Sequence, residues 1–293
     1  MKTTKDLLKK VKLIELNTKQ LVDGLIAGNY HSVFKGQGIE FSEIRDYRPG
    51  DDIRTIDWKV TARYNHPFVK EFIEERDLRV IFLVDFSASG SFGNNIEKKN
   101  KAIQITASLM FSALRNNDSV GLFIFTDKVE KYIPARKGKR HILKLLKELL
   151  TFNPDGKETN LSKSLNFVGN VLKRKSLVFL ISDFYSDSFM KPLSALRHRH
   201  DIVSVRIRDK RELEIPDVGL IELEDEETGE QILVDTSDPE FRQNYIELIK
   251  SNDVKLKTSF IKNKIDMIDL SSDTDLELEL KNFFKMRQRK VVF

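Results

Sequence analysis

Short continuous runs of apolar residues recur after residue 78, and stretches with helical periodicity separate them. The runs 79–85 (RVIFLVD), 120–125 (VGLFIF), 177–182 (LVFLIS) and 202–207 are typical of strands buried on both faces of a parallel sheet. Between them, apolar residues spaced three and four apart predict helices. This alternation predicts an α/β fold with a mostly parallel sheet flanked by helices. The remaining predicted elements are helices 97–115, 140–150, 161–173, 239–251 and 275–286, and strands 129–133 and 265–270.

Two parts of the chain depart from this alternation. Within residues 218–236, apolar and acidic residues alternate on both sides of Thr228-Gly229, which predicts a β-hairpin with an acidic face. Before residue 77, a periodic stretch precedes a highly charged one that contains the turn Pro49-Gly50. The predicted organisation is an N-terminal segment at 1–76 (helix 5–28, charged loop 36–66, strand 68–75) and an α/β domain at 77–293 with a hairpin insertion at about 212–237.

Composition narrows the class of protein. The 293 residues are 40% hydrophobic, which is enough to form a core rather than a disordered chain. The 50 basic and 45 acidic side chains give a formal net charge of only +5, which does not indicate nucleic-acid binding. Cysteine is absent, which excludes disulfides, cysteine-ligated zinc and a thiol nucleophile. No apolar stretch predicts a signal peptide or a transmembrane helix, so we expect a cytoplasmic protein.

Oxygen-bearing side chains follow two of the predicted core strands. Asp85 ends the first strand, and the hydroxyls of Ser87 and Ser89 follow it two and four residues later. Asp183 ends the third strand, and Thr159 lies in a loop that opens a helix. Ligands of open parallel sheets bind beyond the carboxyl ends of the strands, and carboxylate and hydroxyl oxygens suit Mg²⁺ or Mn²⁺. An Asp at this position is also common as a helix cap or turn residue.

These five residues resemble a known motif in their order and spacing. Asp85, Ser87 and Ser89, followed by Thr159 and then Asp183, resemble the metal-ion-dependent adhesion site of von Willebrand factor A domains. The resemblance implies a von Willebrand factor A-like fold. It also implies a Mg²⁺ or Mn²⁺ site whose open coordination position accepts a carboxylate from a partner protein, without bond chemistry.

A second set of segments spans nearly the whole chain. It comprises 36–41 (GQGIEF), 45–63 (RDYRPGDDIRTIDWKVTAR), 69–72 (VKEF), 84–89 (VDFSAS), 227–229 (ETG), 234–236 (VDT) and 283–287 (FFKMR). This set is similar to the signature of the bacterial domain-of-unknown-function 58 family. The family resemblance implies a von Willebrand factor A-like domain preceded by an extra N-terminal segment. It also implies association with MoxR-type AAA+ ATPases in the assembly or maturation of client proteins.

The most charged segment of this signature, residues 45–63, admits two interpretations. Its basic and acidic residues alternate densely, so we expect them to form mutual ion pairs and hydrogen bonds. We favour a polar clasp between the N-terminal segment and the sheet domain, in which Trp58 packs against apolar side chains. The alternative is a docking surface for the ATPase or its substrate, since Arg and Trp are enriched at binding hot spots. The candidate docking residues are Arg45, Arg48, Asp51, Asp52, Arg54, Asp57, Trp58 and Arg63.

Other activities have less support in the sequence. A haloacid-dehalogenase-like phosphatase needs a second Asp where Ser87 stands, and no Walker A motif is present. Residues 197–200 (RHRH) suggest a solvated basic loop rather than a metal site. Basic clusters lack interleaved aromatics, so nucleic acid is not predicted, while the basic C-terminal helix leaves open weak peripheral contact with anionic lipid. We therefore expect a non-catalytic interaction adaptor, with a metal-dependent hydrolase or a metal-free scaffold as alternatives.

Overall fold

The computed structural model separates into two compact units, one of residues 34–78 and one of the remaining chain. Of the predicted helix 5–28, only 12–16 lie in the described part, and they are helical. No helix in the described part of the chain is long and apolar enough to cross a membrane. The structure describes residues 12–16, 38–75, 78–87, 96–156, 158–186, 188–209, 212–213, 215–224, 231–271 and 274–291.

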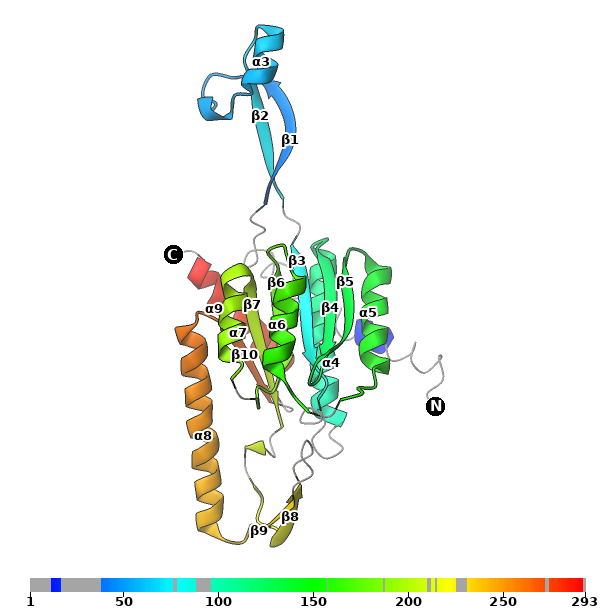
Figure 1. The fold of residues 1–293 in the computed structure, drawn as a ribbon, viewed down its shortest axis with the longest axis vertical. Coiled ribbons are helices and arrows are strands. Elements are labelled where there is room, and N and C mark those ends of the chain that lie inside the picture. The colour runs from blue at the N-terminus through cyan, green and yellow to red at the C-terminus, as the bar shows by residue number, and fades with distance from the viewer. Residues whose placement is uncertain are drawn as a thin grey trace. The chain divides into compact units, whose positions relative to one another are not determined.

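The larger unit contains a six-stranded sheet (Figure 1). In chain order the sheet begins at its centre with β3, extends through β4 to β5, and then returns to add β6, β7 and β10 on the other side. All neighbouring strands are parallel except β4 and β5. The predicted α/β fold with a mostly parallel sheet is therefore confirmed. The strands are β3 (Arg79–Asp85), β4 (Ser119–Phe125), β5 (Val129–Arg136), β6 (Leu177–Ser182), β7 (Asp201–Arg208) and β10 (Asp266–Ser271).

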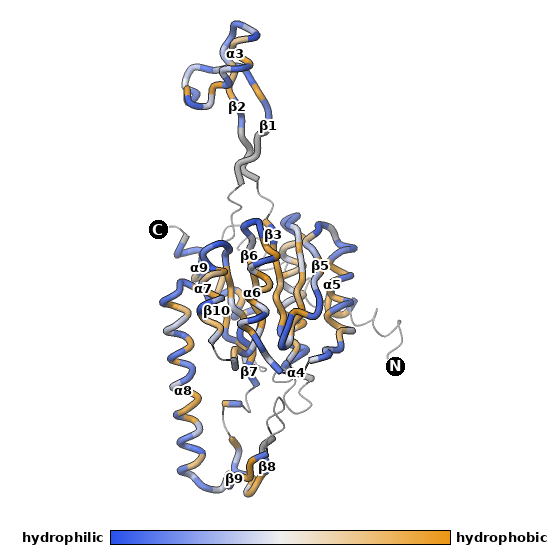
Figure 2. Tube along the Cα trace, viewed as in Figure 1, coloured by the Kyte–Doolittle hydropathy of each residue, from blue (hydrophilic) through white to orange (hydrophobic). Residues whose placement is uncertain are grey.

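Helices cover the sheet because its strands are apolar on both faces. Hydrophobic residues are concentrated along the strands (Figure 2), and Ile81 and Leu83 of β3 share one buried cluster with α6, α7 and Phe260 of α8. Helix α4 packs beside α5 and contains a second set of buried residues, including Leu109 and Met110. The helices are α4 (Ile96–Arg115), α5 (Lys139–Thr151), α6 (Leu161–Val171), α7 (Met190–Arg199), α8 (Pro239–Lys262) and α9 (Leu276–Val291).

Helix boundaries follow local capping chemistry. The Asn160 side chain accepts a hydrogen bond from the Lys163 backbone at 2.9 Å and caps α6. Asp238 caps α8 in the same way, with Pro239 at its first position. The predicted basic loop at 197–200 is wrong, because residues 197–199 form the last turn of α7. Sequence reasoning missed α7 because few buried residues mark its apolar face.

The insertion is a hairpin, as predicted. Strand β8 (Leu220–Glu224) pairs with β9 (Gln231–Asp235) in antiparallel register. Thr236, immediately after β9, is fully buried, and its hydroxyl contacts the Gly219 carbonyl at 2.6 Å. The base of the hairpin is thus held by a side-chain contact as well as by the ladder. The acidic tip lies outside the described residues.

The smaller unit is more regular than the charged loop predicted for 36–66. Strand β1 (Gly38–Asp46) pairs with β2 (Phe68–Glu75) in antiparallel register, with an irregularity between Phe41 and Glu43. A 3-10 turn, η2 (Ile53–Thr55), and a short helix, α3 (Trp58–Tyr64), connect the two strands. Loops and short strands were expected here, and helix α3 was not, because cross-strand pairing and a side-chain cap organise a segment with little apolar periodicity. The predicted strand at 68–75 is confirmed.

Candidate functional site

Asp85 and Asp183 come together at the carboxyl edge of the sheet. Strands β3 and β6 are parallel neighbours, with Val84 opposite Ile181, so Asp85 at the end of β3 and Asp183 just after β6 lie at the same edge. After β3 the chain adds β4 and β5 on one side of this strand, and it then adds β6 on the other side. Such a reversal leaves a crevice where ligands of open α/β sheets bind. The sheet topology therefore supports the predicted position of the site.

The Asp85 carboxylate is held by two serine side chains. Its Oδ1 accepts hydrogen bonds from the Ser87 hydroxyl at 2.6 Å and the Ser87 backbone N–H at 3.0 Å. Its Oδ2 accepts a hydrogen bond from the Ser182 hydroxyl at 2.8 Å. Burial, together with the nearby Asp183 carboxylate, raises the pKa of Asp85 to about 7. The charged form of Asp85 is therefore disfavoured, and a cation beside it would stabilise that form.

Asp183 begins a tight turn after β6. The next residue, Phe184, has a left-handed backbone with φ of 63°, which is uncommon for a large side chain. Its N–H donates to the Ser182 hydroxyl at 3.1 Å, and the Tyr185 N–H donates to Asp183 Oδ1 at 3.1 Å. The buried ammonium of Lys98 lies 3.0 Å from the other carboxylate oxygen, Oδ2. Backbone and side-chain donors thus fix the direction of the Asp183 carboxylate.

The loop that contains Thr159 is tied to the turn between β4 and β5. The Glu130 carboxylate accepts hydrogen bonds from the Asp155 N–H at 3.0 Å and the Gly156 N–H at 3.1 Å. A Cβ at Gly156 would clash with side chains at the end of β4, so this close approach requires glycine. The Asn160 N–H donates to the Thr126 carbonyl at 3.2 Å. These contacts place Thr159 on the wall of the same pocket as Asp183.

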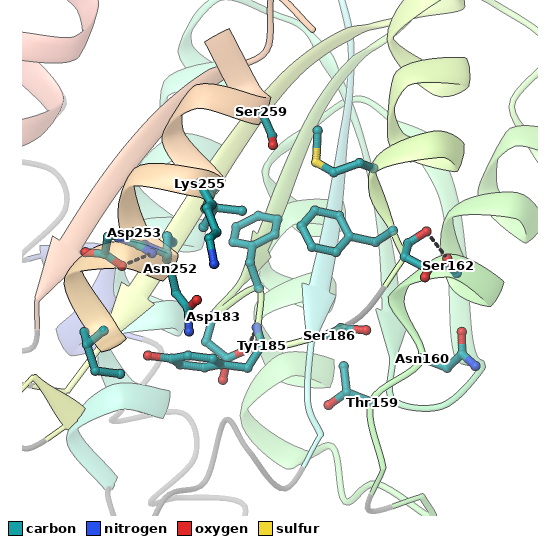
Figure 3. Close-up of a pocket in the computed structure, with 17 residues that line it drawn as sticks. Thr159, Asn160, Ser162, Asp183, Tyr185, Ser186, Asn252, Asp253, Lys255 and Ser259 are labelled. Carbon is teal, nitrogen blue, oxygen red and sulfur yellow. Dashed lines mark hydrogen bonds and ion pairs between the residues drawn. The ribbon is translucent and has the colours of Figure 1, made fainter. Parts of the chain in front are cut away.

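This pocket has a volume of about 850 Å³ (Figure 3). Thr159 lies on one side of it, and Asn252 and Lys255 of α8 lie on the other, with Asp183 and Tyr185 between them. Its lining also includes the apolar residues Phe184, Phe189, Met190, Ile249 and Leu256. Two of the candidate ligands, Thr159 and Asp183, therefore adjoin a space that can accept a polar chain with apolar side groups.

The residues present fit a hard divalent cation. Two carboxylates lie at the sheet edge with a serine hydroxyl beside one of them, and burial together with the nearby Asp183 raises the pKa of Asp85. Ser89 lies outside the described residues. Within the described ranges, no group of three or more His, Cys, Asp or Glu side chains is arranged to hold a metal ion. A cation at Asp85 and Asp183 would therefore depend on hydroxyl groups, water or a partner's oxygen to complete its ligands.

The charged signature of the smaller unit forms the expected ion pairs. Arg45 forms two hydrogen bonds with the Asp51 carboxylate, at 2.7 and 2.9 Å. That guanidinium and the Arg48 backbone N–H hold the pKa of Asp51 at about 2. Arg54 contacts Asp52 at 2.7 Å. The prediction of mutual pairing is confirmed for these residues.

Asp57 and Trp58 mark the start of α3. The Asp57 carboxylate caps the helix through the backbone N–H groups of Lys59 and Val60, and it lies 3.3 Å from the Lys70 ammonium. The side chain of Trp58 is 69% exposed, so it is not packed into the smaller unit, and its packing against the sheet domain stays a prediction. It is the first residue of a helix that contains no buried residues. Other exposed residues in this unit include Arg48, Ile53, Lys59, Arg63 and Tyr64.

Comparison with protein families gives a match over residues 43–255 to the model described as "Protein of unknown function DUF58". The chain belongs to the DUF58 family. It is 30% identical over 283 residues to the uncharacterized protein Rv1480 of Mycobacterium tuberculosis, covering 95% of this chain and 89% of that protein. It is also 30% identical over 108 residues to the uncharacterized protein YeaD of Bacillus subtilis, covering 37% of this chain and 25% of that protein.

Two solved structures illustrate the structural neighbours of this DUF58 protein. One is BatB from Bacteroides thetaiotaomicron, which is 13% identical, with a TM-score of 0.47 over 72% of this chain and 99% of that chain. Another is proximal thread matrix protein 1 from the mussel byssus, whose structure is described with a zinc-occupied MIDAS motif. It is 19% identical, with a TM-score of 0.39 over 72% of this chain and 47% of that chain.

Sequence reasoning missed three residues at the site of this DUF58 protein. Ser182 bonds Asp85, and Lys98 pairs with both Asp183 and Glu212. Ser182 was visible in the sequence as the residue before Asp183, but strand periodicity gave it no role. Lys98 and Glu212 carry no local signal, because they lie 85 residues before and 29 residues after Asp183 in the chain. Only the tertiary fold brings them together.

Proposed function

We propose that this DUF58 protein is a non-catalytic protein-interaction adaptor that binds Mg²⁺ or Mn²⁺ at its sheet edge. The observation that carries the proposal is the meeting of Asp85 and Asp183 at the ends of β3 and β6, beside an open pocket. The proposed oxygen donors are Asp85, Ser87, Ser89, Thr159 and Asp183, directly or through water. A bound cation would supply an open coordination position for a carboxylate of a partner protein.

The pocket suits an acidic segment of such a partner. Lys255 supplies positive charge on its α8 wall, while Met190 and Leu256 provide apolar surface beside it. We propose a MoxR-type AAA+ ATPase or its client as the partner, which is what the family resemblance implies. The exposed residues around Trp58 form a second candidate docking surface.

Metal binding is tested by calorimetric titration of Mn²⁺ and Mg²⁺ into the full chain after treatment with a chelator. We expect one site in the wild type and at least a tenfold loss of affinity in Asp85→Ala and Asp183→Ala. Asp127→Ala is the matched control, because it removes an aspartate near the end of the adjacent strand β4 that is not a proposed ligand. Equal affinity in all four proteins, or no binding by the wild type, would contradict the metal site.

Partner binding is tested by affinity capture from the native cell lysate, with wild type and Asp85→Ala compared in Mg²⁺ and in chelator. We expect a MoxR-type ATPase or a client only with wild type and Mg²⁺. A partner retained under all four conditions would contradict a metal-bridged contact and would direct attention to the smaller unit. No captured ATPase or client under any condition would contradict the adaptor proposal.

A metal-dependent hydrolase is the second candidate function. One observation favours it: the pKa of Asp85, raised to about 7, suits a group that exchanges protons near neutral pH. A screen of phosphate monoesters and carboxyl esters with Mg²⁺ and Mn²⁺ tests it. Turnover that disappears in Asp85→Asn would replace the adaptor with an enzyme, and no metal-dependent turnover would remove this candidate.

A metal-free scaffold is the third candidate. The contact between Lys98 and Asp183 favours it, because an ammonium group can supply positive charge where a metal would otherwise be needed. The calorimetric titration decides between this metal-free scaffold and the two metal-dependent functions. A single metal site lost in Asp183→Ala would exclude the scaffold.

A further inference from the structure

A buried lysine from α4 lies between two carboxylates at the candidate metal site. The Lys98 ammonium is 3.0 Å from Asp183 Oδ2 and 2.9 Å from Glu212 Oε1. All three residues are buried, with relative exposures of 4% for Lys98, 6% for Asp183 and 5% for Glu212. A charged group in such a place is held by its partners rather than by water. Both carboxylates therefore hold the ammonium in place.

The lysine contacts the Asp183 oxygen that a cation would need. Asp183 Oδ1 already accepts the Tyr185 backbone N–H, so Oδ2 is the oxygen oriented by a side chain alone. A cation bound at Oδ2 would be repelled by the ammonium at the same atom. The Glu212 carboxylate is also within hydrogen-bond distance of the ammonium. The ammonium can therefore move away from Asp183 and still keep one carboxylate as its partner.

We propose that Lys98 is a built-in cation that competes with the divalent metal for Asp183, and that Glu212 retains its ammonium when the metal binds. This inference rests on the proposed function, because it concerns the affinity of the same site. Lys98 and Glu212 are positioning residues that would set how tightly metal binds. Neither is a proposed ligand.

The charges of the cluster support such an exchange. Among the described residues, the Lys98 ammonium contacts the carboxylates of Asp183 and Glu212, and Asp85 lies near Asp183, so this lysine does not neutralise all three carboxylates when they are ionised. A divalent cation would balance the remaining charge. The Tyr245 hydroxyl of α8 donates a hydrogen bond to the Glu212 carbonyl at 2.9 Å. The residue that receives the ammonium is therefore attached to the helix that forms one wall of the pocket.

Two substitutions should change metal affinity in opposite directions. Lys98→Met removes the competing charge, so we expect Mn²⁺ to bind about tenfold or more tightly than to wild type. Glu212→Gln removes the second partner of the ammonium and one nearby negative charge, so we expect Mn²⁺ to bind about tenfold or more weakly. Lys99→Met is the control, because it removes the same charge from the exposed neighbouring residue. Calorimetric titration of Mn²⁺ into each chelator-treated protein measures all four affinities.

The double variant Lys98→Met/Glu212→Gln removes one charge of each sign and should bind Mn²⁺ within about threefold of the wild type. Circular dichroism checks that each variant is folded. If Lys98→Met does not fold, the inference is tested by the weaker Mn²⁺ binding that we expect of Glu212→Gln. Wild-type binding that neither substitution changes, or that Lys98→Met weakens, would overturn this inference and leave the proposed function intact. No Mn²⁺ binding by wild type or any variant would overturn both.

Discussion

Arg206 and Asp269 lie directly opposite each other on the parallel strands β7 and β10, and their side chains form a bidentate ion pair. The two nitrogen–oxygen distances are 3.0 and 2.9 Å. The remaining guanidinium nitrogen, Nη1, contacts Asp253 of α8 at 2.9 Å. Because Arg206 also lines the pocket, one buried residue joins the sheet edge, α8 and the pocket wall.

Arg206→Met should therefore destabilise the larger unit. The substitution leaves Asp269 and Asp253 without a buried partner, although Arg208 still contacts both. We expect the free energy of unfolding to fall by about 3 kcal/mol, which urea denaturation measures. Arg140→Met, at an exposed arginine, should change it by less than about 0.5 kcal/mol. Equal stability of the two variants would contradict a structural role for the ion pair.

Ser182→Ala should weaken metal binding without removing a proposed ligand. The Ser182 hydroxyl donates to Asp85 Oδ2 and accepts the Phe184 N–H, so it orients both halves of the site. Outer-shell substitutions of this kind typically cost about 10- to 100-fold in metal affinity. Calorimetric titration with Mn²⁺ measures the loss. Ser176→Ala, at a buried serine just before the same strand, should leave the affinity unchanged. A similar loss in both variants would indicate a general effect on the sheet.

His200 should make the protein less stable in mild acid. Burial and the positive charges of Arg199 and Arg79 lower the pKa of His200 from 6.5 to about 4. Because the unfolded chain binds the proton first, the contribution to stability is complete above pH 6.5 and is lost as the pH falls toward 4. The loss should reach about 3 kcal/mol, at 1.36 kcal/mol per pKa unit.

His200→Leu should reduce this loss, because leucine cannot be protonated. The substitution removes no side-chain hydrogen bond, since neither ring nitrogen has a partner among the described residues. Urea denaturation at pH 7.5 and pH 5 measures the difference. His198→Leu is the control, because His198 is exposed and lies in the last turn of the helix that ends before His200. If His200→Leu loses as much stability as wild type between the two pH values, the acid sensitivity has another source.

Trp58→Ser should affect binding rather than folding. Trp58 is 69% exposed and belongs to a helix without buried residues, so we expect the free energy of unfolding to change by less than about 0.5 kcal/mol. If the smaller unit docks a partner, affinity capture from lysate should recover at least tenfold less of it. Phe167→Ser, at an exposed aromatic residue of α6, is the control. Undiminished capture would remove Trp58 from the docking surface.

The accuracy of the sequence-based predictions depended on how each element is stabilised. Strands β3 and β6 were predicted with the bounds observed, because strands buried on both faces must be continuously apolar. For the segment that holds strand β1 and helix α3, only loops and short strands without bounds were predicted. These two elements are stabilised by pairing with β2 and by the Asp57 cap, contacts that leave little hydrophobic periodicity. Helix α8 was predicted to end at 251 but continues to Lys262. The prediction stopped early because only Phe260 among the residues of this helix is buried, which leaves little apolar periodicity.

The sequence by itself determined the α/β fold, the core strands and the two aspartates that follow them. These features are local, because runs of consecutive apolar residues indicate the buried strands and the polar residues after them indicate where the strands end. Only the tertiary structure decided which charges meet those aspartates. Lys98 precedes Asp183 by 85 residues, and the pair forms because α4 and the end of β6 are folded side by side in a buried environment. Electrostatic interaction depends on distance in space, and no spacing along the chain encodes it.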